Sequence, residues 1–187
     1  SQLSALRNHI NPHFLFNSLS TLIGLIDEDK DRAKKFVEEL AFVYRYLLQS
    51  SEKPLIPLSE ELAFIKAYYF LLKTRFDERL LLDIYVGNEI AQQMIPPLTL
   101  QILLENAVKH NIISQETPLH IVISEVNSNK VVISNTLQRR AQSVVSTQTG
   151  LANLAAKYQL MQQPGPEIFE TQDKFSVQIT LLPNQAS

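Results

Sequence analysis

The change in hydrophobic periodicity near Lys53 constrains this fold more than any other feature of the sequence. Residues 1–50 show no strand-like alternation, and their apolar residues recur at the three- and four-residue spacing of amphipathic helices. After Lys53, short alternating runs typical of strands are interspersed with further helical segments. We therefore expect an α+β fold, in which an N-terminal helical hairpin precedes helices layered on one mixed sheet.

The hairpin is predicted from two helices separated by a polar turn. The first helix extends to about Ile26, the stretch DEDKDR (27–32) forms the turn, and residues 33–50 form the second helix. Two helices alone bury little surface, so we expect a second copy of the chain to complete a four-helix bundle in a homodimer. One side of the second helix is apolar, and its members are Phe36, Leu40, Val43, Leu47 and Leu48.

The segments after residue 53 are predicted from periodicity and turn residues. Ser59 is expected to be the N-cap of a long helix, because Glu60 and Glu61 then lie in a first turn where the helix dipole favours carboxylates. The domain boundaries are predicted as 1–52 and 53–187. The expected elements are strands at 53–58, 79–86, 119–126 and 130–137, helices at 59–76, 96–111 and 150–161, a polar loop at 138–149, and a hairpin of strands at 167–171 and 175–182.

Composition excludes several classes of protein. The net charge of −2 provides no basic surface for nucleic acid, and the absence of cysteine excludes disulfides and thiolate metal sites. No apolar run approaches the roughly 18 to 20 residues needed to cross a bilayer, so we expect a soluble chain compatible with the cytosol. Because the chain opens inside an amphipathic pattern, we expect it to be part of a longer protein.

The stretch NPHFLFNSLS (11–20) places a proline inside an amphipathic helix. Pro12 lacks an N–H and crowds the preceding turn, so a kink is expected there. His13 then projects from the flank of the apolar stripe at a distorted turn. Most such histidines are structural, and on this ground His9, His110 and His120 have an equal claim. The stripe before the kink is Leu3, Leu6, Ile10 and Phe14, and the stripe after it is Leu15, Leu19, Leu22 and Ile26.

The helix around LLENAVKHN (103–111) divides into an apolar and a polar side. Leu100, Leu103, Leu104, Ala107 and Val108 form the apolar side. A solvated helix surface is one interpretation of the polar side. A magnesium–triphosphate site is the other, because hard oxygens suit Mg²⁺, cations suit phosphate, and a carboxylate can orient or deprotonate a nucleophile. The polar side consists of Glu105, Asn106, Lys109 and His110.

Two weaker signals lie further along the chain. Gly150, in QTGLANL (148–154), follows a polar loop and opens a helix, where free backbone N–H groups can bind phosphate. Asn135 lies at the end of a strand on the same face as Val131 and Ile133. A loop glycine and a turn-forming asparagine are the simpler interpretations of these two residues.

Together these segments resemble the LytS/YehU-type sensor histidine kinases. The stretch LRNHINPHFLFNSLS (6–20) is similar to the phosphoacceptor box of that family, and PPLTLQILLENAVKH (96–110) is similar to its N-box. The helix PLSEELAFIKAYYFLLKTRF (57–76) matches the segment between them. The resemblance covers nearly the whole chain and implies an ATP-binding domain of the GHKL type, shared with GyrB, Hsp90 and MutL.

The resemblance implies roles for particular residues. His13 would receive the γ-phosphate of ATP, and Glu105 and Asn106 would orient the reacting groups and bind Mg²⁺. Separately from the resemblance, Asn17 lies one turn beyond His13, and its position suggests that it orients a water for dephosphorylation. The predicted cofactor-binding residues are Asn106, Lys109, His110, Asn135, Gly150, Leu151 and Asn153.

The same resemblance implies an N-terminal membrane sensor outside this chain and a response regulator partner of the LytTR type. The nucleotide boxes depart from the family pattern, however. Asn135, or Ser134 in an alternative alignment, replaces the adenine-binding aspartate, and Leu137 and Gln148 replace glycines. These losses favour a non-catalytic dimerisation module as the alternative. A GHKL-type ATPase is a further alternative, but it leaves the NPHFLFN stretch unexplained.

Overall fold

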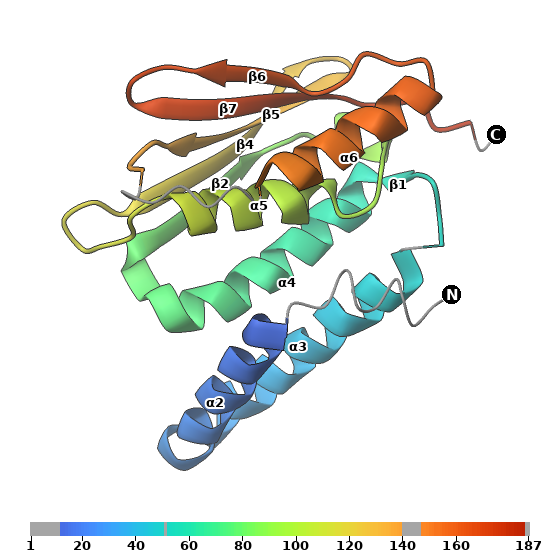
Figure 1. Ribbon diagram of the computed structural model, residues 1–187. Coiled ribbons are helices and arrows are strands. Elements are labelled where there is room, and N and C mark those ends of the chain that lie inside the picture. The colour runs from blue at the N-terminus through green and yellow to red at the C-terminus, as the bar shows by residue number, and fades with distance from the viewer. Residues whose placement is uncertain (1–11, 51, 140–146, 186–187) are drawn as a thin grey trace.

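The computed structural model describes residues 12–50, 52–139 and 147–185. The helices are α2 (Pro12–Glu28), α3 (Lys30–Ser50), α4 (Leu58–Phe76), α5 (Thr99–His110) and α6 (Thr147–Leu160), with short 3-10 helices at Asp77–Arg79 and Ile90–Gln92. The strands are β1 (Ile56–Pro57), β2 (Leu80–Tyr85), β3 (Met94–Ile95), β4 (Leu119–Asn127), β5 (Lys130–Thr136), β6 (Glu167–Glu170) and β7 (Lys174–Thr180). Figure 1 shows three layers: the sheet, then α4, α5 and α6 on one face of it, then α2 and α3 beyond α4. The expected α+β architecture is confirmed.

The sheet is mixed, with strand order β2-β4-β5-β7-β6. β2 and β4 are parallel and are joined by the segment that contains α5, whereas the other neighbours are antiparallel. Alternate residues of the central strands are buried against the helices, and these are Ile121, Ile123, Val131, Ile133, Val177 and Ile179. The short strands β1 and β3 pair separately beside the start of α4.

The turn of the hairpin is shorter than predicted. Asp29 alone separates α2 from α3, and its Oδ1 accepts hydrogen bonds from the backbone N–H groups of Asp31 and Arg32. An aspartate in this position satisfies the first N–H groups of a helix, which explains the sharp reversal.

The apolar side of α3 packs against α4 within the same chain. Phe36, Leu40, Val43 and Leu47 are buried as expected, but Leu48 is 45% exposed and does not belong to this side. A second copy of the chain is therefore not needed to cover this part of the hairpin.

The buried side of α2 differs from the predicted stripe. Leu19 and Ile26 are exposed, whereas Ser18 and Leu25 are buried and Phe14 and Leu22 pack against the core. Leu19 and Ile26 of the predicted apolar stripe therefore remain uncovered within one chain. The expected kink at Pro12 involves the residues before it, which lie outside the described part of the chain.

α4 lies between the hairpin and the sheet layer, so most of its circumference is buried. It begins at Leu58 with Pro57 as its N-cap, and no side chain caps it. The predicted N-cap at Ser59 was wrong. None of the described helices is long and apolar enough to span a membrane.

Candidate functional site

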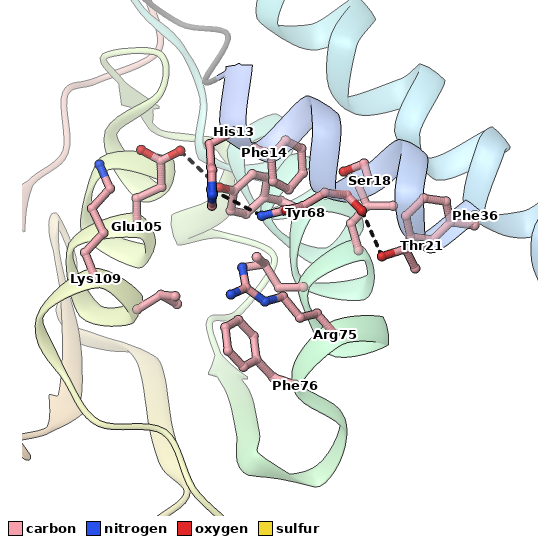
Figure 2. A pocket seen from close by; sticks show the side chains of 14 residues that line it. His13, Phe14, Ser18, Thr21, Phe36, Tyr68, Arg75, Phe76, Glu105 and Lys109 are labelled. Carbon is pink, nitrogen blue, oxygen red and sulfur yellow. Dashed lines mark hydrogen bonds between the residues drawn. The ribbon is translucent and has the colours of Figure 1, made fainter. Parts of the chain in front are cut away.

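A cavity of about 450 Å³ lies between α2, α4 and α5. Its polar lining includes side chains from three helices that are distant in the sequence: His13 and Asn17 from α2, Tyr68 and Arg75 from α4, and Glu105 and Lys109 from α5. Figure 2 shows these helices surrounding the space. His13 thus shares one cavity with two of the four polar residues predicted on α5.

His13 is exposed and hydrogen-bonded along its own helix. The Nδ2 atom of Asn17, one turn on, lies 3.2 Å from Nδ1 of His13. A neutral imidazole carries its proton on one nitrogen and a lone pair on the other, so a partner at Nδ1 helps decide which nitrogen can act as a nucleophile. Because the Nδ2 group of an amide can only donate, Nδ1 of His13 accepts this hydrogen bond and the ring proton lies on Nε2. Asn17 is therefore positioned to select the tautomer of His13.

Phe14, the residue after His13, holds α2 against α4. Its ring stacks on Tyr68 with a centroid distance of 5.1 Å. Tyr68 stacks on Phe64 at 5.9 Å, and Phe64 stacks on Tyr46 of α3 at 4.3 Å. Each such aromatic pair contributes about 0.5 to 1.5 kcal/mol beyond burial. This row of rings fixes the first described turn of α2, and with it the position of His13.

The carboxylate of Glu105 is oriented by two donors. The Tyr68 hydroxyl donates to Oε1 at 3.0 Å, and the side-chain amide of Gln101 donates to the same oxygen at 3.2 Å. Burial, together with the nearby Glu105 carboxylate, raises the pKa of Tyr68 well above its ordinary value, so the hydroxyl stays protonated as a donor. Glu105 is thereby held at the cavity as a hydrogen-bond or proton acceptor.

Two cationic side chains complete the lining. Lys109 is exposed one turn beyond Glu105, as predicted from the sequence. Arg75, in the last turn of α4, places its guanidinium carbon 4.9 Å from the centre of the Phe76 ring. Sequence analysis missed both Arg75 and Tyr68, because the almost continuous apolar pattern of α4 does not show which of its side chains faces α5.

Asn106 and His110 lie on a different side of α5. Successive helical residues are about 100° apart, so Asn106 points away from Glu105, and His110 follows it one turn on. Neither residue lines the cavity. Within the described part of the chain, the Nδ2 atom of Asn106 is buried without a hydrogen-bond partner. A buried amide of this kind is costly unless a ligand satisfies it. The predicted four-residue cluster is thus divided between two sides of one helix.

The start of α5 is fixed by a buried carboxylate on α4. Glu61 accepts hydrogen bonds from the backbone N–H groups of Leu98 and Leu100, both at 3.2 Å, and from the Tyr46 hydroxyl. Burial raises the pKa of Glu61, and these donors partly oppose the shift. Because Leu98 has a left-handed conformation (φ 67°), α5 begins at Thr99 rather than at the preceding prolines, as the sequence had suggested.

Asn135 lies on the helix-facing side of the sheet. It shares this side with Val131 and Ile133, whereas Ser134 points to the opposite face. The Nδ2 atom of Asn135 donates to the carbonyl of Thr136 at 2.8 Å. The alternation of the strand therefore favours Asn135 over Ser134 as the residue directed toward the helices.

Gly150 lies in the first turn of α6, which begins at Thr147 instead of at the glycine. A Cβ atom at this position would lie 3.0 Å from Cγ2 of Ile102 on α5. Glycine therefore allows α6 to approach α5 closely. Leu151 is half-buried and Asn153 is exposed. Most of the predicted loop 138–149 lies outside the described residues, as does the side chain of Gln148.

Comparison with known proteins gives consistent matches. The family model for histidine kinases matches residues 1–80. The sensor protein LytS of Bacillus cereus is 37% identical over 110 residues, which cover 59% of this chain and 19% of that protein. The sensor histidine kinase/phosphatase LytS of Staphylococcus aureus is 28% identical over 144 residues, which cover 77% of this chain and 25% of that protein. The solved structure of the histidine kinase AdeS from Acinetobacter baumannii matches with a TM-score of 0.44 at 15% identity, covering 90% of this chain and 95% of that one.

The chain is therefore similar to histidine kinases, with the family model matching residues 1–80, and these curated relatives are LytS proteins. The chain spans about a fifth to a quarter of the length of these curated relatives.

Proposed function

We propose that this chain is the kinase core of a sensor histidine kinase in a two-component system. It transfers the γ-phosphoryl group of Mg-ATP to His13, and from there to an aspartate of a response regulator. The observation that carries this proposal is the cavity that His13 shares with Glu105 and Lys109 of the predicted N-box helix (Figure 2).

The donor set on α5 fits a magnesium–triphosphate group. Mg²⁺ commonly takes one or two protein oxygens and completes its shell with water and phosphate oxygens. The described residues contain no group of three or more acidic, histidine or cysteine side chains that could hold a metal by themselves. Asn106 would supply a side-chain oxygen to the ion, and its buried Nδ2 would supply a donor to a phosphate oxygen. Lys109 and His110 add cationic or hydrogen-bonding groups along the phosphates.

The rest of the nucleotide would be held by residues of α6 and of the end of β5. The first turn of α6, which contains Gly150, offers backbone N–H groups to phosphate, and Leu151 and Asn153 follow on the same helix. Asn135 faces the helix layer and accepts from the adenine amino group through Oδ1. This amide lacks the charge of the aspartate found in the family pattern, so the adenine contact is weak.

The chemistry at the cavity is a nucleophilic displacement. A ring nitrogen of His13 forms the new N–P bond while the bond from phosphorus to the bridging oxygen breaks, and ADP leaves with that electron pair. Asn17 holds the ring, Glu105 accepts the ring proton that is lost, and Lys109 offsets charge on the phosphoryl oxygens. Such transfer depends mostly on positioning and charge stabilisation.

The second partner in this proposal is another copy of the chain. α2 exposes an apolar stripe with the three- and four-residue spacing of a helix-packing seam. The stripe consists of Phe16, Leu19, Ile23 and Ile26, which are between 42% and 67% exposed. Because α4 already covers α3, this stripe on α2 replaces the apolar side of α3 as the basis for a dimeric bundle.

The remaining assignments follow from the family. We assign residues 1–52 to dimerisation and phosphoacceptance and residues 53–187 to ATP binding. The response regulator is of the LytTR type, and the chain lies on the cytoplasmic side of a membrane-anchored parent protein. The Asn135 replacement favours one alternative, a non-catalytic dimerisation module that binds nucleotide weakly or not at all.

Labelling decides between these functions. The chain is incubated with γ-labelled ATP and Mg²⁺, and the modified residue is located by mass spectrometry. We expect acid-labile, base-stable label on His13 that disappears in His13→Gln. His120→Gln is the matched control, because His120 is paired with Asp83 at 2.6 Å on the sheet. Absence of label in the wild type, or label on another histidine, contradicts the proposal.

A further inference from the structure

The cavity is lined by a cationic residue to which the family resemblance assigns no role. Phosphoryl transfer spreads negative charge over three oxygens, and cationic groups fixed in place before the reaction stabilise that charge most effectively. Among the lining residues, the cationic side chains are Lys109 of α5 and Arg75 of α4. Arginine presents several donors in a planar fork that matches two phosphate oxygens at once.

The guanidinium of Arg75 is held in place by a ring. It lies over Phe76 at 4.9 Å, and Phe76 is only 8% exposed, so the plane of this ring is fixed by the core. Figure 2 shows the guanidinium directed from α4 into the cavity, on the side to which the ring of His13 also points.

The acidic side chains nearest in sequence are paired with other cations. Asp77 forms an ion pair with Arg79 at 3.3 Å, and Glu78 forms one with Lys73 at 4.0 Å. No ion pair of the described residues involves Arg75. The carboxylate that shares the cavity with Arg75 is that of Glu105, which accepts hydrogen bonds from Tyr68 and Gln101.

A purely structural role for Arg75 would be to bind the last carbonyl groups of α4. Arg79 already does this, since its Nε atom donates to the carbonyl of Phe76 at 2.9 Å and its Nη2 atom donates to the carbonyl of Arg75 at 3.0 Å. We propose that Arg75 is a catalytic residue, whose guanidinium contacts the phosphoryl group as it passes to His13. This inference rests on the function proposed above.

Arg79 provides a matched control, because it is also an arginine beside the Phe76 ring but does not line the cavity. The rate of His13 labelling is measured against ATP concentration for the wild type, Arg75→Ala, Arg75→Lys and Arg79→Ala, with thermal unfolding of each protein. For Arg75→Ala we expect the maximal rate to fall by about 100-fold, as for the loss of one preorganised donor, with little change in the ATP concentration at half-maximal rate. Arg75→Lys keeps the positive charge but not the planar fork of donors. Its maximal rate is expected to lie between those of the wild type and Arg75→Ala.

Chemical rescue separates catalysis from folding. Guanidinium ion at concentrations below those that unfold the protein should restore part of the rate to Arg75→Ala and leave Arg79→Ala unchanged. The inference is overturned if Arg75→Ala labels like the wild type, if Arg79→Ala loses as much activity, or if the loss follows lower thermal stability and resists rescue. If the wild type itself does not label His13, the proposed function fails first, and the role of Arg75 fails with it.

Discussion

Asn135 occupies the position where the family pattern has an aspartate, and its replacement tests the adenine site. Asn135→Asp is expected to tighten ATP binding roughly tenfold, because a charged acceptor adds about 1 to 2 kcal/mol to the bond with the adenine amino group. The substitution also removes the donor to the Thr136 carbonyl. That loss occurs in free and bound protein alike, so it lowers stability without opposing affinity. Calorimetry of ATP binding measures the change.

Ser134→Asp is the matched control for this substitution. Ser134 is the neighbouring residue on the same strand, but it points to the face of the sheet opposite the helices. A carboxylate at Ser134 should therefore leave ATP affinity unchanged. If Ser134→Asp tightens binding and Asn135→Asp does not, the alternative alignment of this box is the correct one.

Candidate site residues could be recognised in the sequence where they differ clearly from the residues around them. His13 stands beside a proline, and Glu105 and Lys109 interrupt an apolar helix, so each could be singled out without a structure. Tyr68 and Arg75 could not, because both belong to α4, which is buried on most sides. Their contribution depends on which part of α4 faces α5, and only the tertiary packing decides this.

At the scale of elements, Glu61 connects α3, α4 and α5. Glu61→Ala leaves the buried N–H groups at the start of α5 without their acceptor, so it should lower the free energy of unfolding by about 2 to 3 kcal/mol. Tyr46→Phe removes the donor from α3 and should cost about 1 to 2 kcal/mol. The double variant is expected to lose less than the sum, because the Tyr46–Glu61 bond is lost only once. Urea unfolding measures all three values.

Glu60→Ala serves as the comparison for these variants. Glu60 is exposed in the same first turn of α4, so its removal should change stability by no more than about 0.5 kcal/mol. A similar loss in Glu60→Ala would mean that the helix dipole, and not the link to α5, accounts for the effect. Fully additive losses would show that Tyr46 and Glu61 are not coupled.

Most helices and strands could be predicted, because periodicity is a local property. Their ends were harder to predict, since some of them depend on distant residues. α5 begins at Thr99 because the carboxylate of Glu61, from another helix, accepts the N–H groups around Leu98. The position of Ser59 suggested an N-cap, but α4 follows directly on β1, which pairs with β3, so the N-cap is Pro57, two residues earlier.

The exposed stripe of α2 tests the proposed dimer. Ile23→Glu places a charge in the middle of this stripe, where burial against a second copy would be costly. We expect sedimentation to show a dimer for the wild type and a monomer for Ile23→Glu at the same micromolar concentration. The fold should persist, since Ile23 is 67% exposed within one chain.

Val126→Glu is the control for this experiment, because Val126 is an exposed apolar residue on β4, in the sheet layer on the far side of α4 from the hairpin. It should sediment like the wild type. A wild type that remains monomeric, or a Val126→Glu variant that dissociates while Ile23→Glu does not, would remove α2 from the interface.

At the scale of the whole molecule, the order of the layers decides which surfaces remain for partners. The sequence predicted both the hairpin and the sheet, but it could not show that α4 lies between them. This placement buries the apolar side of α3, leaves the stripe of α2 exposed, and brings His13 to α5 of its own chain. Such packing preferences depend on tertiary contacts, which sequence periodicity does not record.

This arrangement predicts that the phosphoryl group is transferred within one subunit. His13→Gln removes the acceptor, whereas Asn106→Ala removes the proposed Mg-ATP ligand and leaves His13 intact. Because one chain supplies both sides of the cavity, a mixture of the two variants should remain unlabelled. Differently tagged subunits that purify together show that mixed dimers have formed, and wild type mixed with either variant confirms that such dimers are active. Label on the Asn106→Ala chain in the mixture of the two variants would instead mean that α5 of one subunit serves His13 of the other.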